Sequence, residues 1–167
     1  LDALPTPAAK SIRKREADVD LDEATARKAM HACYASISFV DTLVGRVLAA
    51  VDALGLREKT VVLFTSDHGY HMAEHGDYQK VTLFVDSDRV PLILSAAGMS
   101  IRGQMTDVIM EMIDFYRTLS DLADVPDPEP FVLGESFAAV LDNAKLSARP
   151  GAITQLVNGY SLRTPRY

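Results

Sequence analysis

Apolar residues recur every three or four positions between residues 30 and 54, which is the spacing of one face of an α-helix. They are Met30, Cys33, Ile37, Val40, Val44, Val47, Val51 and Leu54. Asp20 is the expected N-cap, with Glu23 as its capping-box partner, and Gly55 is the expected left-handed residue after the helix. The pattern predicts a long helix that packs one apolar stripe against a core.

Two short, continuous apolar runs follow at residues 60–65 and 90–95. Both are rich in branched side chains and lack alternation, which predicts strands buried on both faces, as in a parallel sheet. Pro91 favours an edge or strand-start position for the second run. Residues 109–122 have helical spacing, and residues 134–141 are expected to form a short helix.

The C-terminal region has a strong hairpin signal. Residues 153–157 and 160–163 read as strands on either side of Asn158-Gly159, a dipeptide that favours tight hairpin turns. A proline-rich linker at residues 125–134 precedes this region. Together these elements predict an α/β fold.

Composition limits the possible functions. The net charge of -6 argues against a nucleic-acid-binding surface. The single cysteine, Cys33, excludes an intramolecular disulfide and a cysteine-based zinc site. Because no uninterrupted run of 18 apolar residues occurs, we expect no membrane partner.

Candidate chemistry lies directly after the first predicted strand. Asp67 and His68 are a carboxylate and an imidazole, and Gly69 would let the chain leave strand geometry so that both reach one metal ion. The alternatives are a capping Asp beside a solvated His, or a histidine-rich zinc site. The ligands of the zinc site would come from Asp67, His68, Glu74, His75 and Asp77. Lys80 is either a solvated side chain or a point charge for an anion.

The run T-S-D-H-G-Y-H-M-A-E-H-G-D-Y-Q-K, followed by R-V-P-L-I, resembles the sulfatase family of the alkaline-phosphatase superfamily. The resemblance is nearest to the iduronate-2-sulfatase and choline-sulfatase types. The preceding Y-A-S-I-S-F-V-D-T-L-V-G-R-V-L is similar to a helix of that family. The later I-D-F-Y-R-T-L-S-D-L-A-D-V-P, G-E-S-F and G-Y-S-L-R-T-P-R-Y are similar to its closing helix, a turn and the start of its C-terminal subdomain.

The resemblance implies part of the mixed-sheet sulfatase sandwich plus the start of a small C-terminal antiparallel sheet. Residues 1–124 would belong to the catalytic domain, 125–134 to the linker and 135–167 to the C-terminal subdomain. The implied activity is sulfuric ester hydrolysis of a small sulfated sugar, aryl or choline-type substrate. An oligomer is possible on this interpretation, and the cellular location stays open.

The resemblance also implies roles for single residues. Asp67 and His68 match two ligands of a divalent cation, usually calcium. Lys80 matches the lysine that contacts the sulfate ester. His75 lies in the family's E-H-G element, where it either structures the loop or contacts substrate.

The family's nucleophile is a formylglycine made within a C-x-P-S-R motif, and this chain has no such motif. Cys33-Tyr34-Ala35-Ser36-Ile37 imitates it, but Ile37 replaces the arginine and Cys33 lies on the helical stripe, so we interpret Cys33 as a packing residue. The chain is therefore expected to be a C-terminal portion that is inactive alone. The alternatives are a phosphonate or phosphate diester hydrolase, and a non-catalytic fragment.

Several positions depart from the family pattern. Ala73 stands where glycine is common, and Val81 stands where histidine often follows the lysine. The stretch 86–88, Arg117 and Asp124 also differ from the usual residues. These departures leave the expected ligand positions intact but affect the expected loop conformation and substrate.

Overall fold

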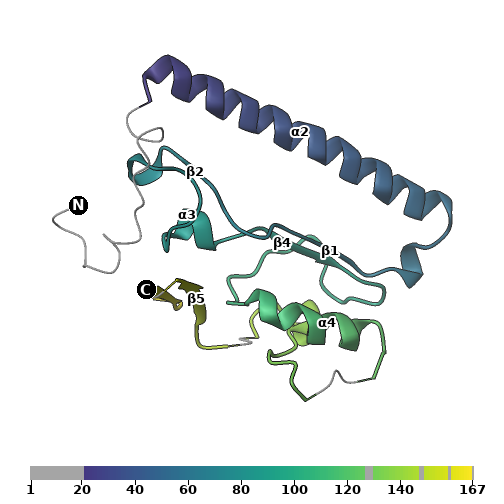
Figure 1. The fold of residues 1–167 in the computed structure, drawn as a ribbon. Helices are drawn as coiled ribbons and strands as arrows, with labels where there is room; N and C mark the ends of the chain where they lie inside the picture. The colour runs from purple at the N-terminus through teal and green to yellow at the C-terminus, as the bar shows by residue number, and fades with distance from the viewer. Residues whose placement is uncertain (1–20, 127–129, 147–148, 158, 167) are drawn as a thin grey trace. The chain divides into compact units, whose positions relative to one another are not determined.

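The computed structural model describes residues 21–126, 130–146, 149–157 and 159–166. Figure 1 shows the order of its elements, beginning with the long helix α2. Their bounds are α2 Glu23–Ala53, η1 Arg57–Lys59, β1 Val62–Thr65, β2 His71–Met72, η2 Glu74–Gly76, β3 Tyr78–Gln79, α3 Val85–Asp88, β4 Leu92–Ser95, η3 Met112–Asp114, α4 Phe115–Leu122, η4 Ala138–Leu141, β5 Ala152–Leu156 and β6 Gly159–Arg163. The chain is a mixed α/β structure, as the apolar pattern predicted.

The N-cap of helix α2 lies two residues after the cap that the sequence suggested. Asp22 is the N-cap, and its carboxylate accepts the backbone N–H of Thr25 at 3.1 Å and the hydroxyl of Thr25 at 2.6 Å. Glu23 is the first helical residue and not a capping-box partner, so that prediction was wrong. Asp20 lies outside the described residues. The threonine supplies two donors to one carboxylate, which favours the later start.

The end of α2 confirms the prediction for Gly55. This glycine has φ 67°, and its N–H donates to the carbonyl of Asp52 at 2.9 Å. The N–H of Leu56 donates to the carbonyl of Val51 at 3.0 Å. These two bonds form a Schellman motif, in which a glycine tolerates the left-handed conformation that ends the helix.

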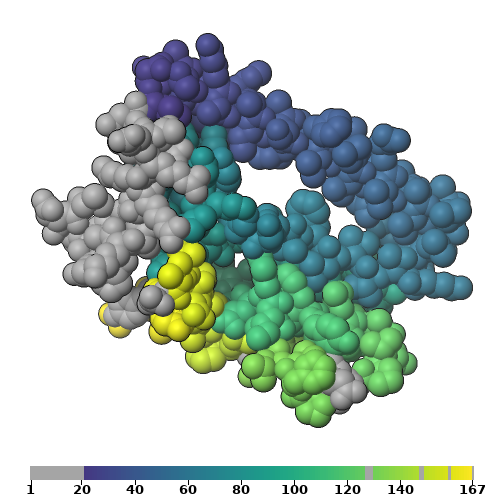
Figure 2. All heavy atoms as spheres, in the orientation of Figure 1, coloured from purple at the N-terminus to yellow at the C-terminus, as the bar shows by residue number. Residues whose placement is uncertain are grey.

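The apolar stripe of α2 is less covered than expected. None of the 31 helical residues is buried, and among the predicted positions only Cys33, Val44 and Val51 are half-buried. Strand β2 packs against the helix, and Figure 2 shows the helix as an elongated ridge of spheres. The prediction of a buried face was therefore wrong for most of the stripe, because spacing identifies an apolar face but not what packs on it.

By length and composition alone, α2 is also long and apolar enough to cross a membrane. The sequence search for an uninterrupted apolar run missed this helix because charged residues interrupt it, for example Asp41 and Arg46. Core helices of soluble proteins share this length and composition.

The predicted strands are present but are not buried on both faces. Among the described residues the strands pair as three two-stranded sheets, β1 with β4, β2 with β3, and β5 with β6. Every residue of β1 is half-buried, and Ile93 in β4 is exposed. The hairpin of β5 and β6 confirms the C-terminal prediction, although Asn158 at its turn lies outside the described residues.

The helix predicted at residues 109–122 begins later than expected. Residues 104–111 have no regular structure, and η3 and α4 occupy residues 112–122. A capping box explains the start, because the carboxylate of Asp114 accepts the backbone N–H of Glu111 at 2.9 Å. The apolar spacing of residues 109–111 does not reveal where the helix begins, because the capping box is formed by polar side chains.

The chain forms two compact units, each made of several segments. The first comprises Leu1–Arg57, Thr65–Leu92 and Gln155–Gly159, and the second comprises Glu58–Phe64, Ile93–Thr154 and Tyr160–Tyr167. All buried residues described in the first unit are polar, namely His71, Asp77, Thr82 and Ser87. The candidate site lies in this unit. The domain boundaries at residues 124 and 134 stay a prediction.

The second unit has a buried ion network. Arg149 pairs through its guanidinium with Glu111 and with the fully buried Asp114. Asp114 also accepts the backbone N–H of Glu135 at 2.9 Å, and Glu111 accepts that of Ile153 at 2.5 Å. Three separate chain segments are therefore tied together through two carboxylates and one arginine.

Candidate functional site

The chain turns sharply after β1, at a strand-end corner formed by residues 66–69. The hydroxyl of Ser66 donates to the carbonyl of His68 at 2.9 Å, and the backbone N–H of His68 donates to the carboxylate of Asp67 at 3.1 Å. The N–H of Gly69 donates to the carbonyl of Ser87 at 2.8 Å. A Cβ on Gly69 would lie 1.9 Å from the carbonyl oxygen of Asp86, so the corner needs glycine because of this close approach.

Asp67 and His68 direct their side chains toward a common point. The Nε2 atom of His68 lies 3.3 Å from Oδ2 of Asp67. The Nδ1 atom lies 2.8 Å from the carbonyl oxygen of Gly69, which only accepts hydrogen bonds, so Nδ1 carries the proton. Nε2 therefore presents a lone pair beside a carboxylate oxygen. This is the arrangement in which a histidine ligates a metal while its other nitrogen is held by the backbone.

Lys80 reaches the same point from twelve residues away. Its Nζ lies 2.5 Å from Nε2 of His68. The desolvation of Asp67 raises the pKa of that carboxyl group, but the backbone hydrogen bonds that it accepts and the charge of Lys80 hold this pKa below its ordinary value. The structure thus brings together three of the four residues that the sequence analysis selected.

His75 occupies a different part of the loop. Its ring stacks on Phe84 with centroids 4.1 Å apart, and its Nε2 lies 3.6 Å from the carboxylate of Asp86. No contact of the ring with Asp67, His68 or Lys80 is found in the described part of the chain. These contacts fit the interpretation of His75 as a loop-structuring residue, and a contact with substrate stays a prediction.

The loop that carries Lys80 holds several residues in the left-handed region. Ala73 has φ 99°, Gln79 has φ 74° and Val81 has φ 79°. Such conformations cost about 1–3 kcal/mol each for residues other than glycine, and persist only where the surroundings enforce them. Ala73 and Val81 are two of the positions that depart from the sulfatase pattern. The carboxylate of Glu74 accepts the backbone N–H of Met72 at 2.5 Å, which lowers the pKa of Glu74.

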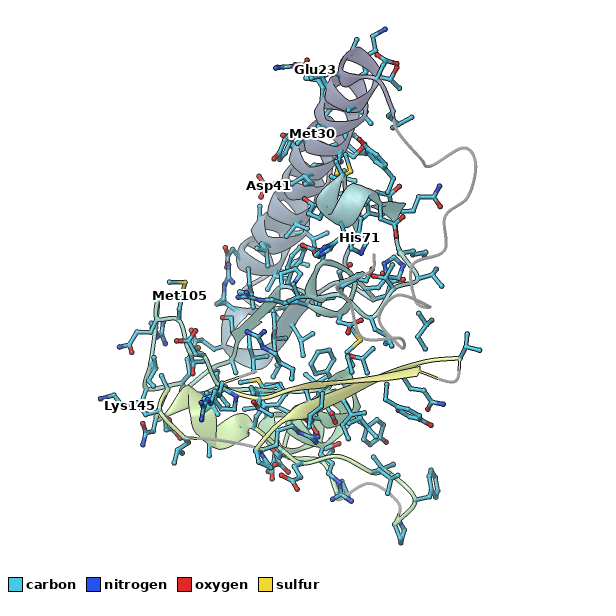
Figure 3. All side chains as sticks on the ribbon, turned by 90° about the vertical axis from the view of Figure 1, so that its left-hand side faces the viewer. Glu23, Met30, Asp41, His71, Met105 and Lys145 are labelled. Carbon is cyan, nitrogen blue, oxygen red and sulfur yellow. The ribbon has the colours of Figure 1, made fainter. Side chains whose placement is uncertain are left out.

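A buried histidine in this loop was missed by the sequence analysis. His71 has no exposed surface, and its Nε2 lies 2.7 Å from the hydroxyl of Thr82, which also bonds Ser87. Figure 3 labels His71 on its ribbon segment. The sequence has no pattern that marks His71 as buried, because β2 and β3 have only two residues each and are too short for a recognisable alternation of apolar and polar residues.

Cys33 lies in helix α2. It is half-buried and borders an open, largely apolar hollow of about 330 Å³ between α2 and the β2–β3 hairpin. The lining residues are Ala29, Ala32, Cys33, Ser36, Tyr70, Met72 and Tyr78. The interpretation of Cys33 as a packing residue stays a prediction.

The donor set fits part of a metal site. Asp67 and His68 are one oxygen and one nitrogen ligand, and the exposed fractions of their side chains are 82% and 34%, so both are open to further ligands. Among the described residues no group of three or more metal-ligating side chains is close enough to hold an ion. The histidine-rich zinc site considered from the sequence is therefore not formed there. A complete coordination shell would need ligands from elsewhere.

Comparisons with known proteins point to one family. The family model described as Sulfatase matches residues 5–125. Mouse iduronate 2-sulfatase is 35% identical over 126 residues, which is 61% of this chain and 23% of that protein. The chain thus spans about a quarter of that relative's length.

Solved structures give the same result for the fold. A structure of BT4656 in complex with its substrate D-glucosamine-2-N,6-O-disulfate matches with a TM-score of 0.68 and 27% identity, over 77% of this chain and 28% of that one. The phosphonate monoester hydrolase SpPMH from Silicibacter pomeroyi matches with a TM-score of 0.64 and 29% identity, over 70% of this chain and 23% of that one. The match covers only a minor part of each enzyme.

Proposed function

Because this chain belongs to the sulfatase family, we propose that it is a portion of a sulfuric ester hydrolase with Asp67 and His68 as metal ligands. The observation that carries the proposal is the convergence of Lys80 on these two residues, with Nζ 2.5 Å from Nε2 of His68. Sulfate ester cleavage develops negative charge on the sulfate and leaving oxygens. A metal and an ammonium group at one strand end are suited to stabilise that charge.

In this proposal, Asp67 and Nε2 of His68 would hold calcium or another divalent cation. When bound, the cation supplies a Lewis acid for the sulfate oxygens. The carbonyl of Gly69 fixes the tautomer of His68, so the lone pair of Nε2 stays available. That lone pair does not serve both a cation and the Lys80 ammonium. We therefore expect Lys80 to turn to the sulfate group in the loaded protein.

Lys80 would act as a point charge at the leaving oxygen. In the overall reaction water is added, the bond between sulfur and the leaving oxygen breaks, and that oxygen takes up a proton as sulfate is released. The nucleophile would be a formylglycine supplied by a preceding part of the polypeptide. A small sulfated sugar is the favoured substrate class, because BT4656 acts on a sulfated glucosamine.

A phosphonate or phosphate ester hydrolase is the second candidate. The similarity to SpPMH supports it, because sulfate and phosphate esters are both tetrahedral oxyanions that one metal and one lysine can bind. Turnover of matched aryl sulfates and phosphate diesters by the same preparation separates the two candidates. Faster phosphate diester turnover would favour the second.

Replacement of Lys80 tests the proposal directly. In the full-length protein, Lys80→Ala should lower kcat/KM for an aryl sulfate by about 10²–10³-fold, the usual loss for one charge-stabilising donor. Chelation with EDTA should abolish turnover, and Asp67→Asn should raise the calcium concentration needed to restore it. Lys28→Ala on the exposed side of α2 is the matched control and should leave kcat/KM unchanged.

Two results would reject the proposed function. One is a Lys80→Ala variant that releases sulfate at the rate of the unmodified protein. The other is the absence of sulfate release across a broad panel of sugar and aryl sulfates when formylglycine has been confirmed by mass spectrometry.

A further inference from the structure

The hydroxyl of Thr82 is the centre of a buried network. It donates to Oγ of Ser87 at 3.0 Å and accepts the backbone N–H of Phe84 at 3.3 Å. Its third neighbour is Nε2 of His71, at 2.7 Å. His71, Thr82 and Ser87 have exposed fractions of 0%, 4% and 6%, so no bulk water competes for these bonds.

This network fixes the tautomer of His71. The alternative, in which Ser87 donates to Thr82 and Thr82 donates to Nε2, would leave a buried N–H donor at Nδ1 without a partner, which is rare in folded proteins. We therefore assign the 2.7 Å contact to an Nε2–H donor on the histidine. Nδ1 is then an unprotonated acceptor, buried and without a hydrogen-bond partner. A buried polar atom without a partner is unfavourable, and an apolar side chain would avoid it. The hydrogen bond that Nε2–H donates to Thr82 must therefore offset the cost of burying Nδ1 without a partner.

The network connects the chain segment around Lys80 with the strand-end corner. His71 pairs with Gln79 in the β2–β3 hairpin, one residue before Lys80, and Thr82 follows Lys80 by two residues. Ser87 accepts the backbone N–H of Gly69 at 2.8 Å through its carbonyl oxygen, next to His68. One chain of hydrogen bonds thus reaches both sides of Lys80 and the strand-end corner.

The backbone around Lys80 needs such support. Gln79 at φ 74° and Val81 at φ 79° flank the lysine in left-handed conformations, and Val81 is β-branched. Without anchors, the segment would relax to ordinary φ values and carry Nζ away from His68. The anchors on either side are the hairpin pairing of His71 and the buried hydroxyl of Thr82.

We propose that His71 is a positioning residue that acts through Thr82 and Ser87 to hold the backbone at Lys80 beside the Asp67–His68 corner. The proposal rests on the proposed function for its catalytic consequence. Its structural content concerns the order of residues 78–84, and this can be measured without any turnover.

Two variants distinguish the effect of losing the hydrogen bond from the effect of losing the packing of the His71 ring. His71→Leu fills the space but removes the donor to Thr82, whereas His71→Gln retains an N–H₂ group at a similar distance from the backbone. Amide hydrogen exchange of the full-length protein is the first measurement. We expect exchange in residues 78–84 to be faster by about tenfold or more in His71→Leu, because local opening governs exchange, and to be restored toward the original rate in His71→Gln. Unchanged exchange in His71→Leu would overturn the proposal.

A double-mutant cycle with Lys80→Ala is the second measurement. His71→Leu should lower kcat for an aryl sulfate by about 10²-fold, as expected for a misplaced catalytic group, with little change in KM. In the Lys80→Ala background it should cause no further loss, because its effect passes through Lys80. An equal loss in both backgrounds would overturn the proposal.

The two measurements distinguish the failure of this inference from failure of the proposed function. If Lys80→Ala leaves sulfate release unchanged, the proposed function fails, while hydrogen exchange still decides whether His71 orders the loop. If Lys80→Ala impairs turnover but neither measurement responds to His71→Leu, the inference alone fails.

Discussion

At residue 69 the backbone of the strand-end corner passes so close to residues 86–89 that a side chain has no room. A Cβ there would lie 1.9 Å from the carbonyl oxygen of Asp86 and 3.1 Å from that of Arg89, and both are backbone atoms. Asp67 and His68, the two expected ligands, directly precede this close approach. We therefore expect a side chain at residue 69 to displace them.

Substitution of this glycine is a test at the residue scale. Gly69→Ala should destabilise the folded chain by about 3 kcal/mol, the upper range for overpacking a close contact, and should weaken calcium binding. Gly45→Ala is the matched control, because a Cβ at Gly45 meets nothing within 4 Å. That change should stabilise helix α2 by about 0.5–1 kcal/mol. Urea unfolding and calcium titration are the measurements, and similar effects at both glycines would contradict the close approach.

At the scale of elements, the ion network of the second unit joins η3, the irregular segment at residue 135 and β5. Arg149 provides the only positive charge in the described bonds of Glu111 and Asp114, whose side chains are 19% and 0% exposed. A buried carboxylate without a partner is strongly unfavourable, whereas an exposed ion pair contributes little. We therefore expect the loss of stability on breaking this ion pair to depend on how deeply the pair is buried.

Removal of the arginine tests this network. Arg149→Met should lower the free energy of unfolding by about 3–5 kcal/mol, the usual loss when a buried pair is broken. Arg27→Met is the matched control, because the Arg27–Glu23 pair on α2 is 77% and 79% exposed, and it should change stability by about 0.5 kcal/mol or less. Equal destabilisation by the two changes in urea unfolding would show that burial is not the deciding factor.

At the scale of the whole molecule, the proposed function needs more groups than these 167 residues supply. Two expected ligands and one lysine converge, but no formylglycine motif occurs in the 167 residues. Helix α2 also leaves large apolar side chains exposed, among them Ile37 and Val47. Both features agree with the proposal that the chain is a portion of a larger enzyme.

This proposal predicts that the 167 residues alone and the full-length protein differ in sulfatase activity. The 167 residues alone should release no sulfate from an aryl sulfate even with saturating calcium, because the nucleophile is missing. The full-length protein should do so under the same conditions. Colorimetric detection of the released phenol measures both, and metal-dependent turnover by the 167 residues alone would contradict the prediction.

The sequence by itself determined the features that depend on near neighbours. Helical spacing and Gly55 predicted α2 and its end, the apolar runs predicted β1 and β4, and Asn158-Gly159 predicted the last hairpin. The motif that contains Asp67, His68 and Lys80 identified the candidate site, because its spacing resembles a known family pattern. The roles of these three side chains stay predictions.

Only the tertiary structure decided burial, tautomers and backbone strain, because each depends on groups that are distant in sequence. The stripe of α2 is apolar, but its exposure depends on what packs against it. His71 is an ordinary residue in the sequence, and its importance follows from Thr82, eleven residues away. The proton of His68 is located by a carbonyl that the folded corner brings to Nδ1. These contacts turn a recognised motif into a site with defined donors and acceptors.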